Sequence, residues 1–156
     1  MSKQMISSEL LLELQTKFAP AVSVVGENNQ QALLIDLERL LEVLTMLKNS
    51  PEHQFNLLSN LTAVDYLEYF EVVYHLYSLP LKQSITIKTR CPNEQAYVPS
   101  VTAIWPSADF QEREVYDLLG IGFTGHPNLR RILMPDDFPE HPLRKAYQFT
   151  PSQEEG

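Results

Sequence analysis

Three segments in the middle of the chain constrain its fold most, because each combines apolar, aromatic and β-branched residues over the length of a strand. They are predicted as strands over about Phe55–Val64, Phe70–Ser78 and Ser84–Arg90. The middle segment reads Phe-Glu-Val-Val-Tyr-His-Leu-Tyr-Ser, a composition that suits the pleated surface of a sheet. We therefore expect a fold built around these strands, with His75 as a packed or rim residue of the middle one.

The segment before these strands predicts a helix and a hairpin. Ser7 or Ser8 can cap the helix, which Pro20 ends. Two short β-type runs, Val22–Val25 and Ala32–Ile35, flank the turn sequence Gly-Glu-Asn-Asn and indicate a hairpin. The apolar positions expected to face the core from the helix are Leu10, Leu11, Leu14 and Phe18.

Two more helices are predicted, one on each side of the three strands. Asp36 is expected to cap the first of them, which ends near Asn49. Its apolar face is expected to comprise Leu37, Leu40, Leu41, Leu44 and Leu47. The other is predicted over Asp109–Leu119, where Asp109 and Glu112 fit a capping box and Gly120 is placed to end the helix in a left-handed turn.

Prolines change the character of the chain after this last helix. The segment contains Pro127, Pro135, Pro139, Pro142 and Pro151, which exclude a long helix or a central strand. We predict an ordered, extended strap over residues 123–156, packed on the domain of residues 1–122 or on partner subunits. A short edge piece is also expected within Val98–Trp105, limited by its flanking prolines.

The predicted fold class is therefore α+β. The elements form a single compact two-layer domain in the order α-β-β-α-β-β-β-α, followed by the strap. A length of 156 residues fits one domain, and 44% hydrophobic residues argue against disorder.

Charge and cysteine content exclude several classes of function. The net charge of −8 speaks against nucleic-acid binding, which needs a basic face. Residues 123–150 nevertheless balance to +1, which leaves −9 for the rest and indicates a basic strap on an acidic body. Cys91 is the single cysteine, so this chain alone cannot build an intramolecular disulfide, an iron–sulfur cluster or a cysteine-rich zinc site.

No sequence signal predicts a membrane span, a secretory signal or a transit peptide. The histidines His126 and His141 each precede proline and lack further ligands at suitable spacing, so no metal site is expected. The sequence from Gly120 to Gly125 matches the nucleotide-binding pattern G-x-G-x-x-G. That pattern needs a strand before the glycines and a helix after them, whereas here a helix precedes and Pro127 follows. We expect these glycines to serve turns.

The charged helix leaves three interpretations open. Arg113, Glu114 and Asp117 are expected on one side of the helix, opposite Val115, Leu118 and Leu119. The charged side could form a solvated ion pair, hold the arginines of the strap, or supply a general acid or base with His126. The second interpretation is preferred over the first, and the third is disfavoured because the sequence offers neither a nucleophile nor a metal cluster. The strap contributes two basic pairs, Arg130-Arg131 and Arg144-Lys145, whose arginines suit bidentate contacts with carboxylates.

The spacing of these residues resembles a known family signature. Glu-Arg-Glu at 112–114 is followed by Asp117-Leu118-Leu119, then His126, Arg130 and Ile132-Leu133, and later by His-Pro-Leu-Arg-Lys at 141–145. This pattern resembles the C subunit of NADH-quinone oxidoreductase, the thirty-kilodalton subunit family of respiratory complex I. The resemblance covers about Phe55–Tyr147. It departs from the family pattern at Ala146, where many members carry an acid, and at Phe110, where many carry tryptophan.

The resemblance implies a structural subunit of the hydrophilic arm, without flavin, cluster or quinone of its own. Flavin and iron–sulfur clusters are expected on partner subunits, and the partners implied are the quinone-site and iron–sulfur subunits. The expected location is peripheral, on the cytoplasmic side of the cell membrane, and no activity is expected of the isolated chain. Two alternatives stay open: the equivalent subunit of a related membrane-bound hydrogenase or other-donor complex, and a small hydrolase using Glu114 and His126.

Overall fold

The computed structural model of the chain describes residues 8–27, 30–129 and 141. Its centre is a five-stranded sheet in the order β1-β2-β5-β4-β3. The strands are β1 (Val22–Val25), β2 (Ala32–Ile35), β3 (Leu57–Asp65), β4 (Tyr69–Ser78) and β5 (Gln83–Pro92). All neighbours are antiparallel except β2 and β5, which run parallel. The predicted hairpin and the three predicted strands are therefore confirmed.

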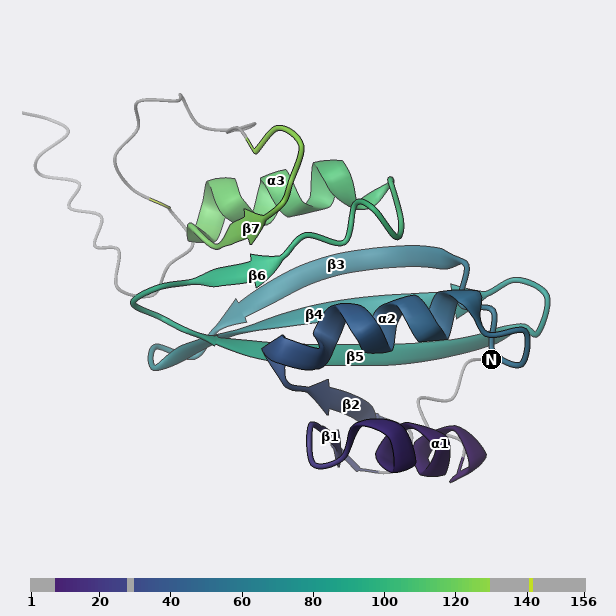
Figure 1. Cartoon of the computed structure of the whole chain (residues 1–156). Helices are drawn as coiled ribbons and strands as arrows, with labels where there is room; N and C mark the ends of the chain where they lie inside the picture. The colour runs from purple at the N-terminus through teal and green to yellow at the C-terminus, as the bar shows by residue number, and fades with distance from the viewer. Residues whose placement is uncertain (1–7, 28–29, 130–140, 142–156) are drawn as a thin grey trace, which may run out of the picture.

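Two helices, α1 (Ser8–Phe18) and α2 (Leu40–Asn49), lie on one face of this sheet (Figure 1). Alternation along the strands sends one set of side chains toward these helices, and this set forms the core. The core comprises Leu10 and Leu14 of α1, Leu40, Val43, Leu44 and Leu47 of α2, and Leu33, Ile35, Leu58, Leu61, Phe70, Val72, Tyr74, Leu76, Ile85 and Ile87 of the sheet. The predicted two-layer α+β class is confirmed.

The start of α2 differs from the prediction. Asp36 makes no side-chain capping bond, and a 3-10 turn over Leu37–Arg39 precedes the α-helix. Leu40, Leu44 and Leu47 face the core as predicted, whereas Leu41 is exposed and Val43 is buried in its place.

The third helix, α3 (Ala108–Leu119), lies along the edge strand β3 (Figure 1). The Gln111 Oε1 atom accepts a hydrogen bond from the Leu61 amide at 2.6 Å, so the helix satisfies part of the strand's open edge. The helix ends at Gly120, whose φ of 80° is the predicted left-handed cap. In the part of the chain that the structure describes, no helix is long and apolar enough to cross a membrane.

Two short strands next to α3 form a second sheet. The edge piece expected within residues 98–105 is β6 (Tyr97–Pro99), and it pairs in parallel with β7 (Gly122–Thr124). Sequence reasoning missed β7. In this strand Phe123 pairs with Val98 and is buried. The remainder of the strap, apart from a short piece before residue 130 and His141, lies outside the described residues. The division of the chain into a domain of residues 1–122 and a strap of residues 123–156 stays a prediction.

The glycines at 120–125 serve turns and close contacts, as expected. Gly120 and Gly125 have positive φ, and no strand–glycine–helix unit surrounds them. Gly122 lies opposite Tyr97, and a Cβ atom placed on it would come within 2.5 Å of the tyrosine ring. The ring therefore covers a glycine across the strand pair, an arrangement that stabilises such edges.

A variant of this glycine tests the contact. Gly122→Ala should push the exposed Tyr97 ring into solvent and lower the free energy of unfolding by about 1 kcal/mol. In a Tyr97→Ala background the same change should be neutral or stabilise by about 0.4–1 kcal/mol, because alanine reduces the entropy of the unfolded chain. Urea denaturation of the four proteins measures both effects. An equal cost in both backgrounds would contradict the contact.

Candidate functional site

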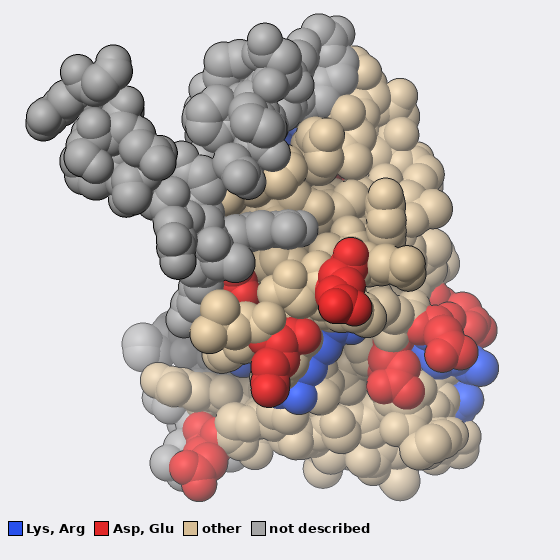
Figure 2. Space-filling view, turned by 90° about the vertical axis from the view of Figure 1, so that its left-hand side faces the viewer, with Lys and Arg blue, Asp and Glu red and all other residues tan. Residues whose placement is uncertain are grey.

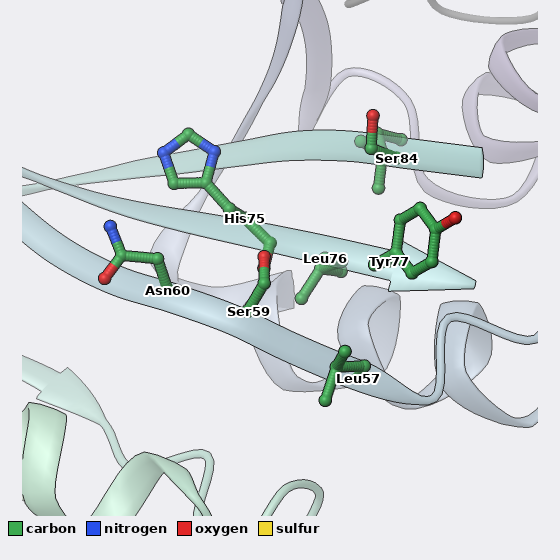
Figure 3. Close-up of a pocket in the computed structure, with 8 residues that line it drawn as sticks. Leu57, Ser59, Asn60, His75, Leu76, Tyr77 and Ser84 are labelled. Atoms are coloured by element: carbon green, nitrogen blue, oxygen red, sulfur yellow. The ribbon is translucent and has the colours of Figure 1, made fainter. Parts of the chain in front are cut away.

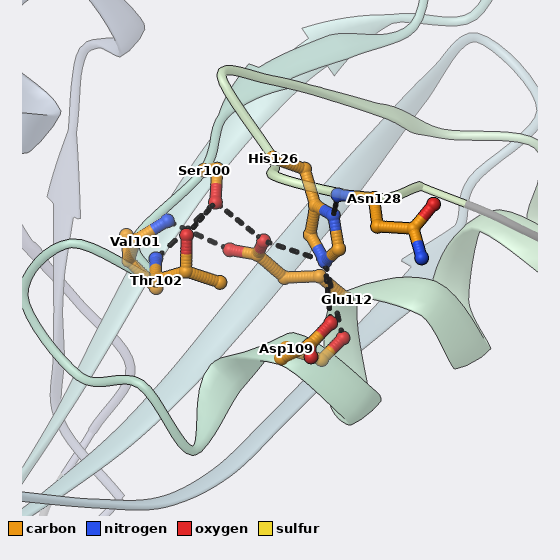
Figure 4. A network of polar contacts seen from close by, with 7 residues as sticks. All are labelled: Ser100, Val101, Thr102, Asp109, Glu112, His126 and Asn128. Atoms are coloured by element: carbon orange, nitrogen blue, oxygen red, sulfur yellow. Dashed lines mark hydrogen bonds and ion pairs between the residues drawn. The ribbon is translucent and has the colours of Figure 1, made fainter.

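A buried polar network surrounds Glu112 on α3 (Figure 4). The Glu112 side chain is fully buried. Its Oε1 accepts a hydrogen bond from the Ser100 hydroxyl at 2.7 Å, and its Oε2 accepts one from the Val101 amide at 2.7 Å. The Ser100 hydroxyl oxygen in turn accepts from the Thr102 amide at 3.2 Å. One carboxylate on α3 thus holds the loop that follows β6.

His126, in the turn after β7, completes the network from the other side. Its Nδ1 accepts a hydrogen bond from the Asn128 amide at 2.9 Å, which places the proton of the neutral ring on Nε2. The Nε2 atom lies 2.9 Å from Asp109 Oδ1 and 4.0 Å from Glu112 Oε1. The imidazole is buried although the residue's backbone is partly exposed. The network therefore joins the β6 loop, α3 and the β7 turn.

This environment changes the titration of the carboxyl group. Burial raises the pKa of Glu112 above its ordinary value, and the bonds from Val101 and Ser100 and the nearby His126 oppose the rise. The fully buried Tyr74 hydroxyl faces the same region, and burial together with the Glu112 charge raises the pKa of that phenol well above its ordinary value. The tyrosine is accordingly neutral.

The geometry does not match nucleophilic catalysis. A serine nucleophile needs its hydroxyl hydrogen directed to a base such as histidine, but the buried Ser100 hydroxyl is bonded to Glu112. The hydrolase interpretation pairs Glu114 with His126. The described side-chain contacts of His126 go to Asp109 and Glu112, while Glu114 projects about 200° around the helix from Glu112. The pairing that the hydrolase needs is not formed.

Other signature residues lie farther along α3. Asp117, which the sequence places on the same side of the helix as Arg113 and Glu114, is fully buried, and the other two are half-buried. Its backbone carbonyl, one of the last four of the helix, accepts a hydrogen bond from His141 Nδ1 at 2.9 Å. The His141 ring also packs against Tyr116, with centroids 5.7 Å apart. His141 thus contacts the C-terminal end of α3.

The basic strap residues Arg130, Arg131, Arg144 and Lys145 lie outside the described residues. The preferred interpretation, in which the charged helix holds these arginines, therefore stays a prediction. The capping box proposed for Asp109 and Glu112 is wrong. The helix begins at Ala108 after Ser107, so Glu112 lies two positions later than a box requires and turns inward.

Sequence reasoning missed Ser100, Val101 and the contact of Asp109 with His126. The bonds to Glu112 span 11 and 12 positions along the chain, and no local periodicity reports contacts of that kind. The one sequence signal for this contact was the Ser-Val-Thr run directly after Pro99, because serine and threonine hydroxyls often bond to backbone groups in turns.

The open face of the sheet carries a shallow depression of about 420 Å³ (Figure 3). It is lined by Leu57, Ser59, Asn60, His75, Leu76, Tyr77, Ser84 and Ile85. Burial, followed by the Lys88 charge, lowers the pKa of His75, and its Nδ1 lies 3.3 Å from the Thr86 hydroxyl. The Ser59 hydroxyl donates to the His75 carbonyl at 2.9 Å. The prediction of a packed or rim histidine is confirmed.

Two features of the described residues bear on metal binding and thiol reactivity, a group of three side chains near α1 and the thiol of Cys91. Among the described residues, Glu13, Glu52 and His53 form one group whose ligand atoms lie within 4.8 Å of one another. The Glu13 carboxylate already contacts His53 Nε2 at 3.0 Å and Lys17 Nζ at 3.6 Å, which fits the attachment of α1 to the loop before β3. Burial raises the pKa of the Cys91 thiol to about 11, so the thiol stays protonated at neutral pH.

Truncating the central carboxylate tests its structural role. Glu112→Ala should leave the buried Ser100 hydroxyl and Val101 amide without their acceptor, at about 1–3 kcal/mol for each unpaired group. Thermal and urea denaturation should therefore show a large loss of stability. Glu114→Ala, on a half-buried side of the same helix, is the matched control and should cost under about 1 kcal/mol. Equal losses would contradict the network.

The raised pKa of Glu112 gives a pH dependence of stability. Folding raises the pKa of the Glu112 carboxyl group, so the folded state binds its proton more tightly than the unfolded state does. The resulting stabilisation is fully present below the unfolded pKa, near 4.5, and is lost as the pH rises through the folded pKa. Glu112→Gln cannot titrate, so its melting temperature relative to the unsubstituted chain should increase as pH rises from 4 to 7. Scanning calorimetry across that range measures the difference. A difference that is flat or that decreases would refute the assignment.

Comparisons with known proteins agree with the resemblance found in the sequence. The family model described as "Respiratory-chain NADH dehydrogenase, 30 Kd subunit" matches residues 33–153. The C subunit of a NADH-quinone oxidoreductase from Moorella thermoacetica is 46% identical over 138 residues, which cover 87% of this chain and 91% of the relative. The corresponding subunit from Geobacter sulfurreducens is 40% identical over 146 residues, covering 90% and 89%.

Two solved structures share the fold. A trypsin-resistant fragment of Nqo5 superposes with a TM-score of 0.67 at 34% identity, covering 78% of this chain and 97% of the fragment. A chain of the membrane-bound sulfane sulfur reductase, an archaeal respiratory membrane complex, gives a TM-score of 0.77 at 27% identity, covering 94% and 88%. Because the family model spans most of the sequence and these relatives are covered almost end to end, the chain belongs to the family of the 30 Kd subunit of respiratory-chain NADH dehydrogenase.

Proposed function

We propose that this chain is a non-catalytic structural subunit of the hydrophilic arm of a proton-translocating NADH-quinone oxidoreductase. It helps to assemble the quinone-site and iron–sulfur subunits, and it binds no cofactor itself. Flavin and iron–sulfur clusters belong to partner chains, which carry out the redox chemistry. The chain lies on the cytoplasmic side of the cell membrane, where it is a peripheral part of the membrane complex.

One observation in the structure carries this proposal. The carboxylate at the centre of the family signature uses both its oxygens to bind the chain's own loop, through the bonds from Ser100 and Val101 to Glu112. A buried carboxylate committed in this way positions backbone rather than a substrate. The signature thus supports a structural role for this chain. The names of the relatives indicate the complex in which it has that role.

Purification tests the proposal in two steps. From its native membranes, an affinity-tagged copy of the full chain should recover several partner subunits together with NADH-quinone oxidoreductase activity. The full chain expressed alone should show no visible absorbance from a cofactor and no NADH oxidation. Stoichiometric flavin or iron in the isolated chain, or recovery without partner subunits, would refute a structural role in this complex.

A second host complex has specific support. The chain of the sulfane sulfur reductase complex superposes over 94% of this chain with the same fold. A subunit of this shape therefore serves complexes with different electron donors or acceptors. The 46% and 40% identities to NADH-quinone oxidoreductase subunits favour the NADH-linked complex. Assaying the purified complex with NADH and with alternative donors distinguishes the two.

The strap arginines give a further prediction. If Arg131 and Arg144 face partner subunits, changing either to alanine should reduce the yield of assembled complex and leave the melting temperature of the isolated chain within about 2 °C of the unsubstituted value. If instead they pair with carboxylates of the chain's own helix in a buried contact, the isolated chain should lose roughly 3–5 kcal/mol. Melting curves and complex yields for both variants decide between these outcomes.

A further inference from the structure

The hairpin turn between β3 and β4 holds a leucine in an unusual backbone conformation. Leu67 has a φ of +74°, a left-handed value that few residues other than glycine and asparagine adopt. It is the first of the two residues that reverse the chain between Tyr66 and Tyr69, a position that hairpins of this kind usually fill with glycine. A branched side chain at this point is strained.

Contacts on both sides hold the strained residue in place. The Leu67 amide donates to Asp65 Oδ1 at 2.7 Å, and the Leu67 carbonyl accepts from Asn93 Nδ2 at 2.6 Å. Tyr66 is fixed as well, since its amide donates to the Tyr69 carbonyl at 2.9 Å and the two rings lie 5.2 Å apart. The turn is therefore rigid, and it is tied to the loop that follows β5.

The strained turn presents an apolar side chain to solvent. Leu67 is 58% exposed and Tyr66 is 45% exposed. The leucine consequently contributes nothing to the core, although glycine or asparagine would fit the backbone without strain. Strained residues that the surrounding structure holds in place concentrate at functional sites. An exposed, rigidly held leucine beside a tyrosine has the form of an interface anchor.

Charge around this anchor identifies the chemistry of its partner. The two loops at this tip, residues 66–69 and 92–95, contain Glu68 and Glu94, both exposed. Arg90 of β5 lies over the Tyr69 ring at 4.9 Å, but Glu71 pairs with it at 3.0 Å and balances its charge. Figure 2 views this end of the molecule and shows acidic side chains projecting from it, with basic side chains lying beside them. An apolar centre with an acidic rim complements an apolar pocket with a basic rim.

We propose that the tip formed by Tyr66, Leu67, Glu68 and Glu94 is a docking point for a neighbouring subunit of the complex. Leu67 enters an apolar pocket on that subunit, and lysine or arginine side chains around the pocket face the two glutamates. This inference rests on the proposed function, because it assigns one contact through which the chain takes part in assembly.

The substitution Leu67→Asn separates strain from contact. Asparagine accepts the left-handed backbone but removes the apolar anchor, so the isolated full chain should melt at an unchanged temperature or up to roughly 5 °C higher. The tagged chain should nevertheless recover partner subunits at least about tenfold less well than the unsubstituted chain under a salt wash. Reversing both charges, with Glu68→Lys and Glu94→Lys, should also reduce recovery.

Leu79→Asn is the matched control. Leu79 is 59% exposed in the turn between β4 and β5, at the opposite end of the sheet, with ordinary backbone, so its variant should recover partners normally. Normal recovery by Leu67→Asn would overturn the docking point, and a lower melting temperature would overturn the strain argument. Self-association of the isolated chain that Leu67→Asn abolishes would reassign the tip to a second copy. If the unsubstituted chain recovers no partners, the proposed function itself fails.

Discussion

One buried carboxylate joins the loop after β6, the helix α3 and the turn after β7. Glu112 binds the loop after β6 through Ser100 and Val101, and it lies beside His126 from the turn after β7. No hydrophobic contact specifies direction in this way, because apolar packing tolerates sliding whereas paired hydrogen bonds do not. Burying a charge is costly, so the network is better understood as fixing geometry than as adding stability. Its position at the centre of the family signature follows from that role.

The main sheet could be predicted from sequence because its signals are local. Strand composition, the hairpin turn and the helix stop at Gly120 each depend on neighbouring residues, and all three predictions were confirmed. The polar site could be predicted only in part. Glu112 and His126 were identified as signature residues, but a buried carboxylate and a capping carboxylate look the same in sequence. Helical periodicity grouped Asp117 with Arg113 and Glu114, but it could not report that Asp117 is fully buried, because burial depends on segments distant in sequence.

The two structural relatives separate what the fold determines from what it leaves open. The Nqo5 fragment and a chain of the sulfane sulfur reductase complex both share this architecture. One fold can serve different chemistries, so the architecture alone does not choose between host complexes. The sequence identities of 46% and 40% to subunits of NADH-quinone oxidoreductases carry that information instead.

The same network also fixes the direction of the chain in the turn after β7. The His126 ring is held by carboxylates of α3 through Nε2 and accepts the Asn128 amide through Nδ1, so the chain direction at residue 128 is fixed from inside the fold. His141 fixes a second point, at the opposite end of α3. Two histidines thus hold the two ends of one helix, because His126 contacts its first turns through Asp109 and Glu112 and His141 contacts its last turn through the Asp117 carbonyl. Polar contacts of this kind fix the helix in direction as well as in position.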